Sequence, residues 1–291
     1  MAEISAQAVK ALRERTGAGM MDCKKALEDA GGDTEKAVEL LRERGLAKAA
    51  RREGRTTSEG TIGLALTDEA AALVELTCET DFVAKTEEFQ ELARKLAEAV
   101  ARDPAIDSPE KLLAARIGES TGRDLIQAAI ARLGENVVVK RVARLALDAP
   151  GRLGGYVHAG GKLGVVVALA TERTGPEVET LARDLAMHVA AADPTPLAVD
   201  RESLPEEVVA REREFRLREA RASGKPESVV EKMVEGRLRK FFQEVALLDQ
   251  PFVKDPDRRV GQVVAEVAGR VGGEIEVAGF VRYRLGEAEG P

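Results

Sequence analysis

The sequence predicts an α+β fold in which small antiparallel sheets are covered by helices. Two β-like hairpins, at residues 61–79 and 155–171, are each followed by a helix pattern and later by a returning strand. The first 45 residues, by contrast, show only short helical patterns. A chain of 291 residues is long enough for two or three domains with cores of their own. We therefore predict a helical module, then two duplicated sheet-plus-helix subdomains, the second interrupted by an inserted helical hairpin.

Residues 1–54 are predicted to form a three-helix module followed by a basic linker. Ser5 can cap the first helix, and the stretch at 16–19, which contains two glycines, ends it. The second helix stops at Gly31, and the third is expected to end before Gly45. The pattern resembles the ubiquitin-associated (UBA) three-helix module, which exposes a small binding patch.

Two methionines mark the candidate patch on this module. Met20 and Met21 lie at the start of the second helix, and methionine adapts well to irregular binding surfaces. Filling of the module's core is the alternative interpretation, because methionine serves that purpose equally well.

The first core subdomain is predicted at residues 55–148. Strands are expected at 61–67 and 70–79, helical structure over 106–133, and a strand at 136–147. The hairpin is followed by a helix that ends near Asp103, and its apolar residues recur with helical spacing: Phe89, Leu92, Ala93, Leu96, Ala97 and Val100.

The second core subdomain is predicted at residues 149–204 and 243–291. Its hairpin strands are expected at 155–159 and 163–171, and its helix begins near Pro176. A last helix and a last strand are expected at 259–271 and 274–285.

The two subdomains share a local sequence pattern. Leu92-Ala93-Arg94 of the first helix recurs as Leu181-Ala182-Arg183 of the second, and both helices soon meet an Asp-Pro pair. The order of hairpin, helix and returning strand is also the same, so the pattern indicates a structural duplication.

Residues 205–242 are predicted to form an inserted helical hairpin, which we call the arm. Two charged helices flank Ser223-Gly224-Lys225-Pro226, a turn whose proline suits the first position of a helix. The apolar seam is too short and irregular for a free-standing coiled coil. We expect the arm to contact a partner or a second copy of the chain, which would make a homodimer.

Residues 80–85, Thr-Asp-Phe-Val-Ala-Lys, lie where a predicted strand meets a predicted helix. Thr80, Asp81 and Thr86 are all candidate N-caps. An aromatic residue at such a junction can be displayed to a partner. If one helix ran from Thr80 onwards, however, Phe82 would lie seven residues before Phe89 and share its buried stripe. The pattern alone leaves both interpretations of Phe82 open.

The composition points to a protein surface as the partner. The net charge of −7 and the absence of Trp argue against direct nucleic-acid binding. No apolar run approaches the ~20 residues of a membrane helix, and the N-terminus does not look like a signal peptide, so we expect a cytoplasmic protein with no membrane contact. The two cysteines are not closely spaced, which fits a reducing compartment.

The sequence lacks the common catalytic motifs. It has no phosphate loop, no dinucleotide fingerprint and no nucleophile elbow, and its two histidines are too far apart in sequence for a helix-spaced zinc pair. We therefore expect neither an enzyme nor a bound cofactor or metal. A Cys78–His158 nucleophile pair stays open as an alternative.

Two long motifs resemble the translation elongation factor Ts family. They are LRERTGAGMMDCKKAL at 12–27 and ELTCETDFVAK at 75–85. Shorter agreements occur at 186–191, 223–226, 232–237 and 250–253. The resemblance spans nearly the whole chain; Thr77 stands where the family often has Asn, and residues 104–132 match only in character.

The resemblance implies a guanine-nucleotide exchange factor that acts on the GTPase elongation factor Tu without covalent chemistry. Asp81 and Phe82 would form a wedge that disturbs the Mg²⁺ and phosphate site of the GTPase. The implied contact residues are Lys10, Met20, Met21, Lys24, Thr80, Asp81, Phe82, Val83, Lys85 and His158. Two rivals remain: an adaptor that captures ubiquitin-like proteins through residues 1–45, and a thiol enzyme that uses Cys78.

Overall fold

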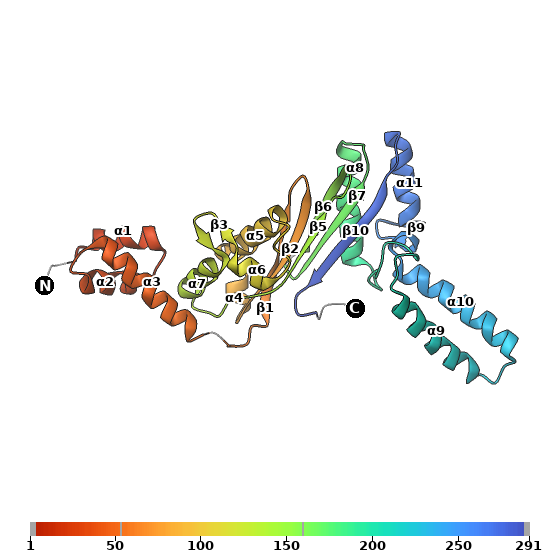
Figure 1. Ribbon diagram of the computed structural model, residues 1–291, viewed down its shortest axis with the longest axis horizontal. Coiled ribbons are helices and arrows are strands. Elements are labelled where there is room, and N and C mark those ends of the chain that lie inside the picture. The colour runs from red at the N-terminus through yellow and green to blue at the C-terminus, as the bar shows by residue number, and fades with distance from the viewer. Residues whose placement is uncertain (1–3, 53, 159, 288–291) are drawn as a thin grey trace.

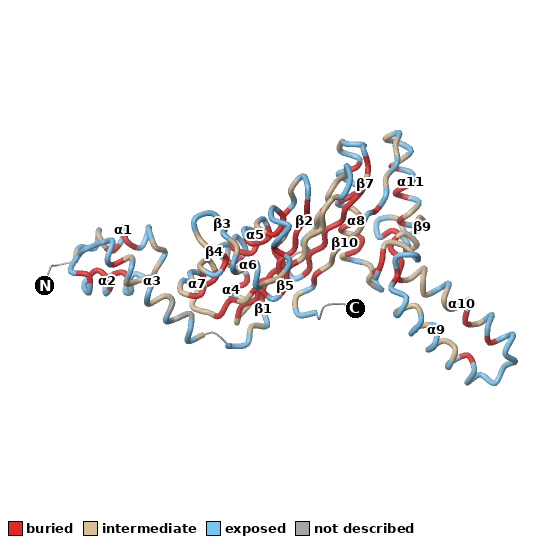
Figure 2. The backbone as a smooth tube through the Cα atoms, viewed as in Figure 1, coloured by how far each residue is buried: buried red, intermediate tan, exposed pale blue. Residues whose placement is uncertain are grey.

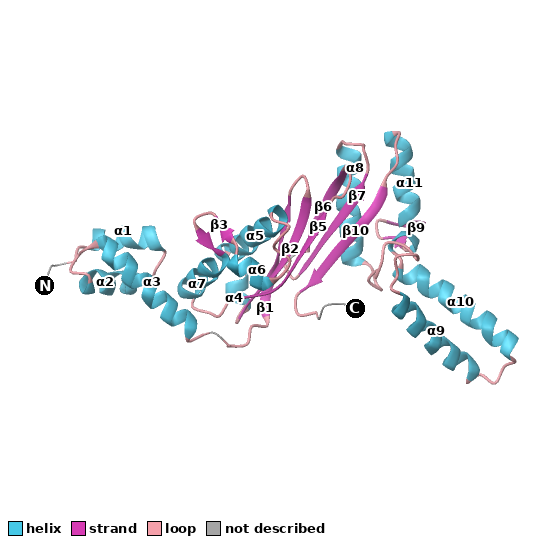
Figure 3. Ribbon diagram, in the orientation of Figure 1, coloured by secondary structure: helices cyan, strands magenta, loops and turns pink. Residues whose placement is uncertain are grey.

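The computed structural model describes residues 4–52, 54–158 and 160–287. The molecule is elongated, with the N-terminal helices at one end, the sheets in the middle and a pair of long helices at the other end (Figures 1 and 3). This mixture of helices and antiparallel sheets confirms the predicted α+β class. The predictions made for residues 1–3 and for Ala159 lie outside the described residues.

Three helices form the N-terminal module: α1 (Ala6–Thr16), α2 (Met20–Asp29) and α3 (Thr34–Ala50). The Ser5 hydroxyl caps α1 by accepting a hydrogen bond from the N–H of Ala8, and Gly17 ends that helix with a positive φ of 68°. The three helices share a small core of their own, which includes Leu12, Cys23 and Leu27.

The third helix is longer than predicted. It continues through Gly45, so the expected end before that glycine was wrong. A Cβ on Gly45 would lie 3.2 Å from the Cβ of Ala131, which belongs to helix α7 (Gly122–Leu133). Tertiary packing therefore overrides the low helix propensity of glycine at this position.

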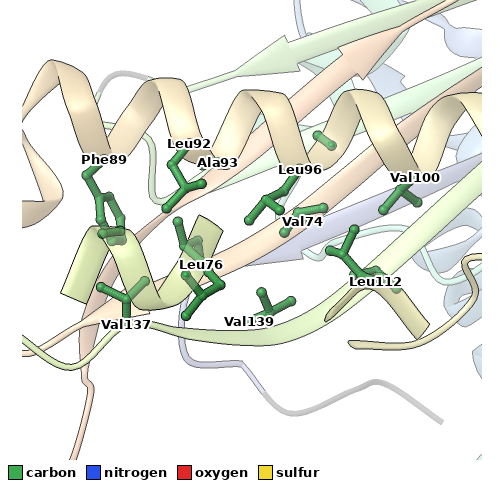
Figure 4. Close-up of a cluster of buried hydrophobic side chains, with 14 of the residues drawn as sticks. Val74, Leu76, Phe89, Leu92, Ala93, Leu96, Val100, Leu112, Val137 and Val139 are labelled. Carbon is green, nitrogen blue, oxygen red and sulfur yellow. The ribbon is translucent and has the colours of Figure 1, made fainter. Parts of the chain in front are cut away.

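The first sheet contains β1 (Glu59–Leu66), β2 (Ala70–Cys78) and β5 (Val138–Ala146), paired antiparallel in the order β1-β2-β5. Helix α5 (Glu87–Arg102) covers its outer face, and the apolar stripe of α5 packs into the core shown in Figure 4. Gly63 is required at this contact, because a Cβ there would lie 2.3 Å from the carbonyl oxygen of Ala93.

The second sheet contains β6 (Gly151–Val157), β7 (Leu163–Ala170) and β10 (Glu276–Arg284), in the order β10-β7-β6. Helix α8 (Pro176–Ala191) packs on it, and helix α11 (Val260–Val271) packs against α8 in the same core. A Cβ on Gly154 would lie 2.4 Å from the carbonyl oxygen of Ala182. Gly63 and Gly154 thus make similar close approaches to Ala93 and Ala182.

The two sheets pack against each other through their inner faces. All nine residues of β2 are buried, because alternate side chains face α5 and the second sheet. Ile62 and Leu73 of the first sheet meet Val166 and Tyr283 of the second in a common cluster. The strands are consequently the most continuously buried part of the chain (Figure 2). The sequence predicted the helices that cover the sheets, but not this contact between the two sheets.

Residues 106–133 are not one helical stretch. Helix α6 (Pro109–Ala114) is followed by a tight hairpin, β3 (Arg116–Ile117) and β4 (Ser120–Thr121), and then by α7. Gly118 takes a positive φ of 69° in the turn, and Thr121 with Asp124 forms a capping box that starts α7. The helical prediction was therefore wrong at this hairpin, whose strands are too short to show a periodicity.

The arm is a pair of helices, α9 (Glu206–Arg221) and α10 (Glu227–Val245). Its inner seam buries Ala220, Val230 and Val234. Between the arm and α11 the chain forms a short 3-10 turn (Leu247–Asp249) and a small hairpin, β8 (Pro251–Phe252) and β9 (Asp255–Arg259), none of which was predicted.

Candidate functional site

A one-turn helix, α4 (Asp81–Ala84), joins β2 to α5. Thr80 is its N-cap: the backbone is extended there, and the hydroxyl oxygen accepts a hydrogen bond from the N–H of Val83 at 3.5 Å. Thr86 then caps α5, because its backbone is extended (ψ 143°) and its hydroxyl accepts from the N–H of Phe89. The chain therefore forms two separate helices here.

This break decides the environment of Phe82. The side chain is 81% exposed, whereas Phe89, seven residues later, is completely buried. A spacing of seven residues places two side chains on one face only within a continuous helix, and Thr86 interrupts that continuity. The interpretation of Phe82 as a core residue was wrong.

Two other residues of α4 pack against the core. Ala84 is buried and Val83 packs against the first core, so one side of the turn is anchored. Lys85 donates a hydrogen bond to the Asp81 carboxylate at 2.6 Å, and this contact lowers the pKa of Asp81. Lys162 makes a smaller contribution in the same direction.

Glu135 binds the two residues that precede α4. One carboxylate oxygen accepts hydrogen bonds from the backbone N–H groups of Glu79 (3.1 Å) and Thr80 (2.9 Å), and the other accepts from the Thr80 hydroxyl at 2.5 Å. The carboxylate of Glu79 in turn accepts from the N–H of Asn136 at 2.7 Å. We call Glu79, Thr80, Glu135 and Asn136 the carboxylate clamp. Glu135 was not among the residues predicted for the site.

His158 lies at the tip of the β6–β7 hairpin and is exposed. Its Nδ1 lies 3.0 Å from the Tyr156 hydroxyl. The same tip contacts the first sheet, because the carbonyl of Gly161 accepts from the N–H of Ile62 at 2.7 Å, and Lys162 pairs with Glu59. Since Lys162 also acts electrostatically on Asp81, this hairpin tip and α4 lie at the same end of the sheets.

The predicted contact residues of the N-terminal module are all on its surface. Met20 and Met21 are 51% and 73% exposed, so core filling was the wrong interpretation of both. Lys10 and Lys24 are exposed and each pairs only weakly with a glutamate one turn later, at 3.8 Å. The module lies apart from α4 along the molecule (Figure 1), so the structure does not gather the predicted residues into one compact site.

The geometry of Cys78 argues against a thiol nucleophile. The residue is fully buried, and its Sγ–H donates to the carbonyl of Thr80 at 3.1 Å. Burial, with a smaller contribution from Glu135, raises the pKa of the thiol to about 11, so it is protonated at neutral pH. Within the described residues, no group of three His, Cys, Asp or Glu side chains is placed to hold a metal ion. In the same part of the chain no helix is both long and apolar enough to span a bilayer.

The other histidine, His188, is a structural residue. It is buried on α8, where Nδ1 accepts from the N–H of Val253 (3.1 Å) and Nε2 lies 2.9 Å from the side-chain oxygen of Gln250. The Gln250 amide donates to the carbonyls of Pro194 and Glu244. Because Nδ1 accepts, the proton sits on Nε2 and the ring is neutral. Burial lowers the pKa of His188.

We expect His188 to make the protein less stable in mild acid. Below about pH 6.5 the unfolded chain takes up a proton at this residue, whereas the folded chain takes one up only at lower pH. The free energy of unfolding therefore falls as pH falls through this range, by at most about 1.4 kcal/mol per pH unit. Urea unfolding at pH 5.5 to 7.5 measures the slope. It should be reduced in His188→Gln and retained in His158→Gln, the exposed control. An equal slope in wild type and His188→Gln would contradict the assignment.

Comparisons with known proteins identify the relatives of the chain. The family model described as elongation factor TS matches residues 79–287. Proteins named elongation factor Ts from Agrobacterium fabrum, Prosthecochloris aestuarii and a Nitratiruptor species are 48%, 45% and 44% identical. The alignments cover 99%, 98% and 98% of this chain and 94%, 100% and 93% of those proteins.

Proposed function

Because the chain belongs to the elongation factor Ts family, we propose that it accelerates the release of GDP from the GTPase elongation factor Tu during translation. Family members are elongation factors and not enzymes of covalent chemistry. A GTPase freed of GDP can bind GTP and begin another round of elongation. A cytoplasmic location and the absence of direct nucleic-acid contact are part of the proposal.

The single observation that carries the mechanism is the exposure of Phe82. A phenylalanine that is 81% exposed on a one-turn helix has no role in its own core. We propose that Phe82 and Asp81 enter the nucleotide domain of the GTPase and disturb the bound Mg²⁺ and the phosphate loop. Displacing a divalent cation beside a diphosphate removes its largest local countercharge, so GDP would bind far more weakly.

The remaining predicted residues extend the contact surface. Met20 and Met21, with Lys10 and Lys24, are assigned to a second contact made by the module, and the module's likeness to UBA domains remains part of this proposal. His158 is assigned to a third contact, on another domain of the GTPase. Contacts made by the N-terminal module at one end of the molecule and by α4 and His158 at the sheets (Figure 1) suit a partner of several domains.

Binding of the factor and binding of the nucleotide must oppose each other. If this protein weakens GDP binding by some factor, GDP weakens binding of this protein by the same factor. We therefore expect tight binding to the nucleotide-free GTPase and dissociation when GDP or GTP is added. The rate of exchange changes, whereas the equilibrium between the two nucleotides does not.

A homodimer formed through the arm stays a separate prediction. Phe215 and Val229, one on each arm helix, are 50% and 40% exposed, so the arm has apolar surface to offer. The division of the chain at residues 54, 148, 204 and 242 is likewise proposed.

Release of fluorescent GDP tests the function directly. Purified elongation factor Tu is loaded with a fluorescent GDP derivative, excess unlabelled GDP is added, and the fluorescence decay is followed with and without this protein. We expect acceleration at amounts well below those of the GTPase, because an exchange factor turns over. A decay rate that does not depend on this protein would contradict the proposal.

A further inference from the structure

We propose that Glu135 is a positioning residue for nucleotide exchange, because its carboxylate fixes the direction in which α4 presents Phe82. This inference rests on the proposed function. It assigns to Glu135 no contact with the GTPase or the nucleotide, only control over a residue that would make one.

The strand register brings Glu135 to this place. Thr77 of β2 pairs with Val138 of β5, so continuing the same register beyond both strand ends sets Thr80 opposite Glu135. Regular pairing has stopped there, since β2 ends at Cys78 and β5 begins at Val138. Gly134 ends α7 with a positive φ of 83°, which turns the chain from the helix towards the strand.

The carboxylate replaces the missing backbone pairing. In an unbroken ladder successive N–H groups point to opposite sides of a strand, so those of Glu79 and Thr80 would pair with carbonyls of the two strands that flank β2. Here both donate to one oxygen of Glu135, while Glu79 accepts from the N–H of Asn136 on the opposite chain segment. Each segment thus satisfies the backbone of the other through an acidic side chain, and charged acceptors make such bonds short and strong.

The contact to the Thr80 hydroxyl extends this control to α4. The Thr80 hydroxyl donates a hydrogen bond to Glu135 and accepts one from the N–H of Val83. One hydroxyl therefore joins the clamp to the first turn of the helix. At the other end of α4 the Thr86 hydroxyl donates to the carbonyl of Val83 at 2.7 Å. The turn that carries Phe82 is therefore held at both ends, and Glu135 restrains its start from outside the segment.

The first test is Glu135→Ala in the fluorescent GDP assay, with the protein varied to saturation. We expect the maximal rate of GDP release to fall about tenfold, since a displacement near 1 Å can cost that much or more. The concentration that gives half the maximal rate should change much less, because the module and His158 still dock. Glu88→Ala is the matched control: Glu88 pairs with Arg132, three residues before Glu135, and lies outside the clamp.

A double-mutant cycle separates positioning from general damage. If Glu135 acts through Phe82, then Glu135→Ala should have no further effect on the maximal rate in a Phe82→Ala background. Glu135→Gln, which keeps the shape and one acceptor oxygen, should give a rate between wild type and alanine, and it replaces alanine in the cycle if that variant does not fold. The inference would be overturned if folded Glu135→Ala kept the wild-type maximal rate. It would also be overturned if Glu135→Ala lowered the maximal rate in the Phe82→Ala background as much as it does in the wild type. No acceleration by the wild-type protein would instead reject the function itself.

Discussion

Phe82→Ala is expected to reduce the acceleration of GDP release about 30-fold, which corresponds to a loss of about 2 kcal/mol. A large aromatic side chain that enters a partner is a typical hot spot, and truncation removes most of its contact area. The stability of the free protein should change by no more than about 0.5 kcal/mol, because the ring is 81% exposed and supports no core. The fluorescent GDP assay and thermal unfolding, monitored by circular dichroism, measure the two effects.

Phe89→Ala provides the matched control, since it is the same substitution seven residues further along the chain. Phe89 is fully buried in the first core (Figure 4), so its truncation should cost about 3–5 kcal/mol of stability. The two phenylalanines should therefore show opposite profiles. A large fall in melting temperature for Phe82→Ala, with normal exchange, would show that this ring supports the fold and does not act on a partner.

The contrast between Phe82 and Phe89 also shows which features of the fold a sequence pattern can predict. The stripe on α5 was predictable because Phe89 and the apolar residues after it share one continuous helix with one buried face. The same reasoning could not place Phe82, because its outcome depends on whether the helix continues through Thr86. A threonine can cap a helix or lie inside one; here Thr86 is a cap, and the two residues of α4 that precede it by two and three positions pack into the core.

The role of Glu135 could not be predicted from the sequence for a different reason. Nothing near Glu135 in the sequence distinguishes it from the other acidic residues of a chain that has 51 of them. Its role appears only when β2 and β5 are paired, which joins residues far apart in the sequence. Local periodicity contains no information on that pairing. Close approaches such as Gly45 on Ala131 are likewise set by tertiary packing, which is why α3 runs past its predicted end.

A buried ion pair links the two sheets, and we expect its removal to cause a large loss of stability. Glu75 of β2 and Arg141 of β5 are both buried, and Arg141 Nε donates to one oxygen of the Glu75 carboxylate. The other oxygen accepts from the N–H of Gly286, beyond the end of β10. Arg141 also donates to the carbonyl of Arg284 at 2.8 Å and lies 4.0 Å above the ring of Tyr283. The pair therefore connects the sheet next to α4 with the sheet that carries His158.

Arg141→Ala is expected to lower the free energy of unfolding by about 3–5 kcal/mol. The substitution leaves the Glu75 carboxylate buried without its countercharge, and we expect this uncompensated charge to be the main cost. It also removes the contact between Arg141 and the ring of Tyr283. Urea unfolding at pH 7, monitored by circular dichroism, measures the change. Lys111→Ala is the control, because Lys111 and Asp107 form an exposed pair whose loss should have no measurable effect.

The double variant Glu75→Leu/Arg141→Met distinguishes charge from packing. If the uncompensated carboxylate causes the loss, then replacing both partners by apolar residues of similar size should recover much of the stability lost in Arg141→Ala. A double variant less stable than Arg141→Ala would contradict this account and assign the loss to packing against Tyr283. Recovery of stability without full recovery of exchange would show that the ion pair also keeps the His158 hairpin and α4 in their relative positions, since the pair lies between the two sheets that carry them.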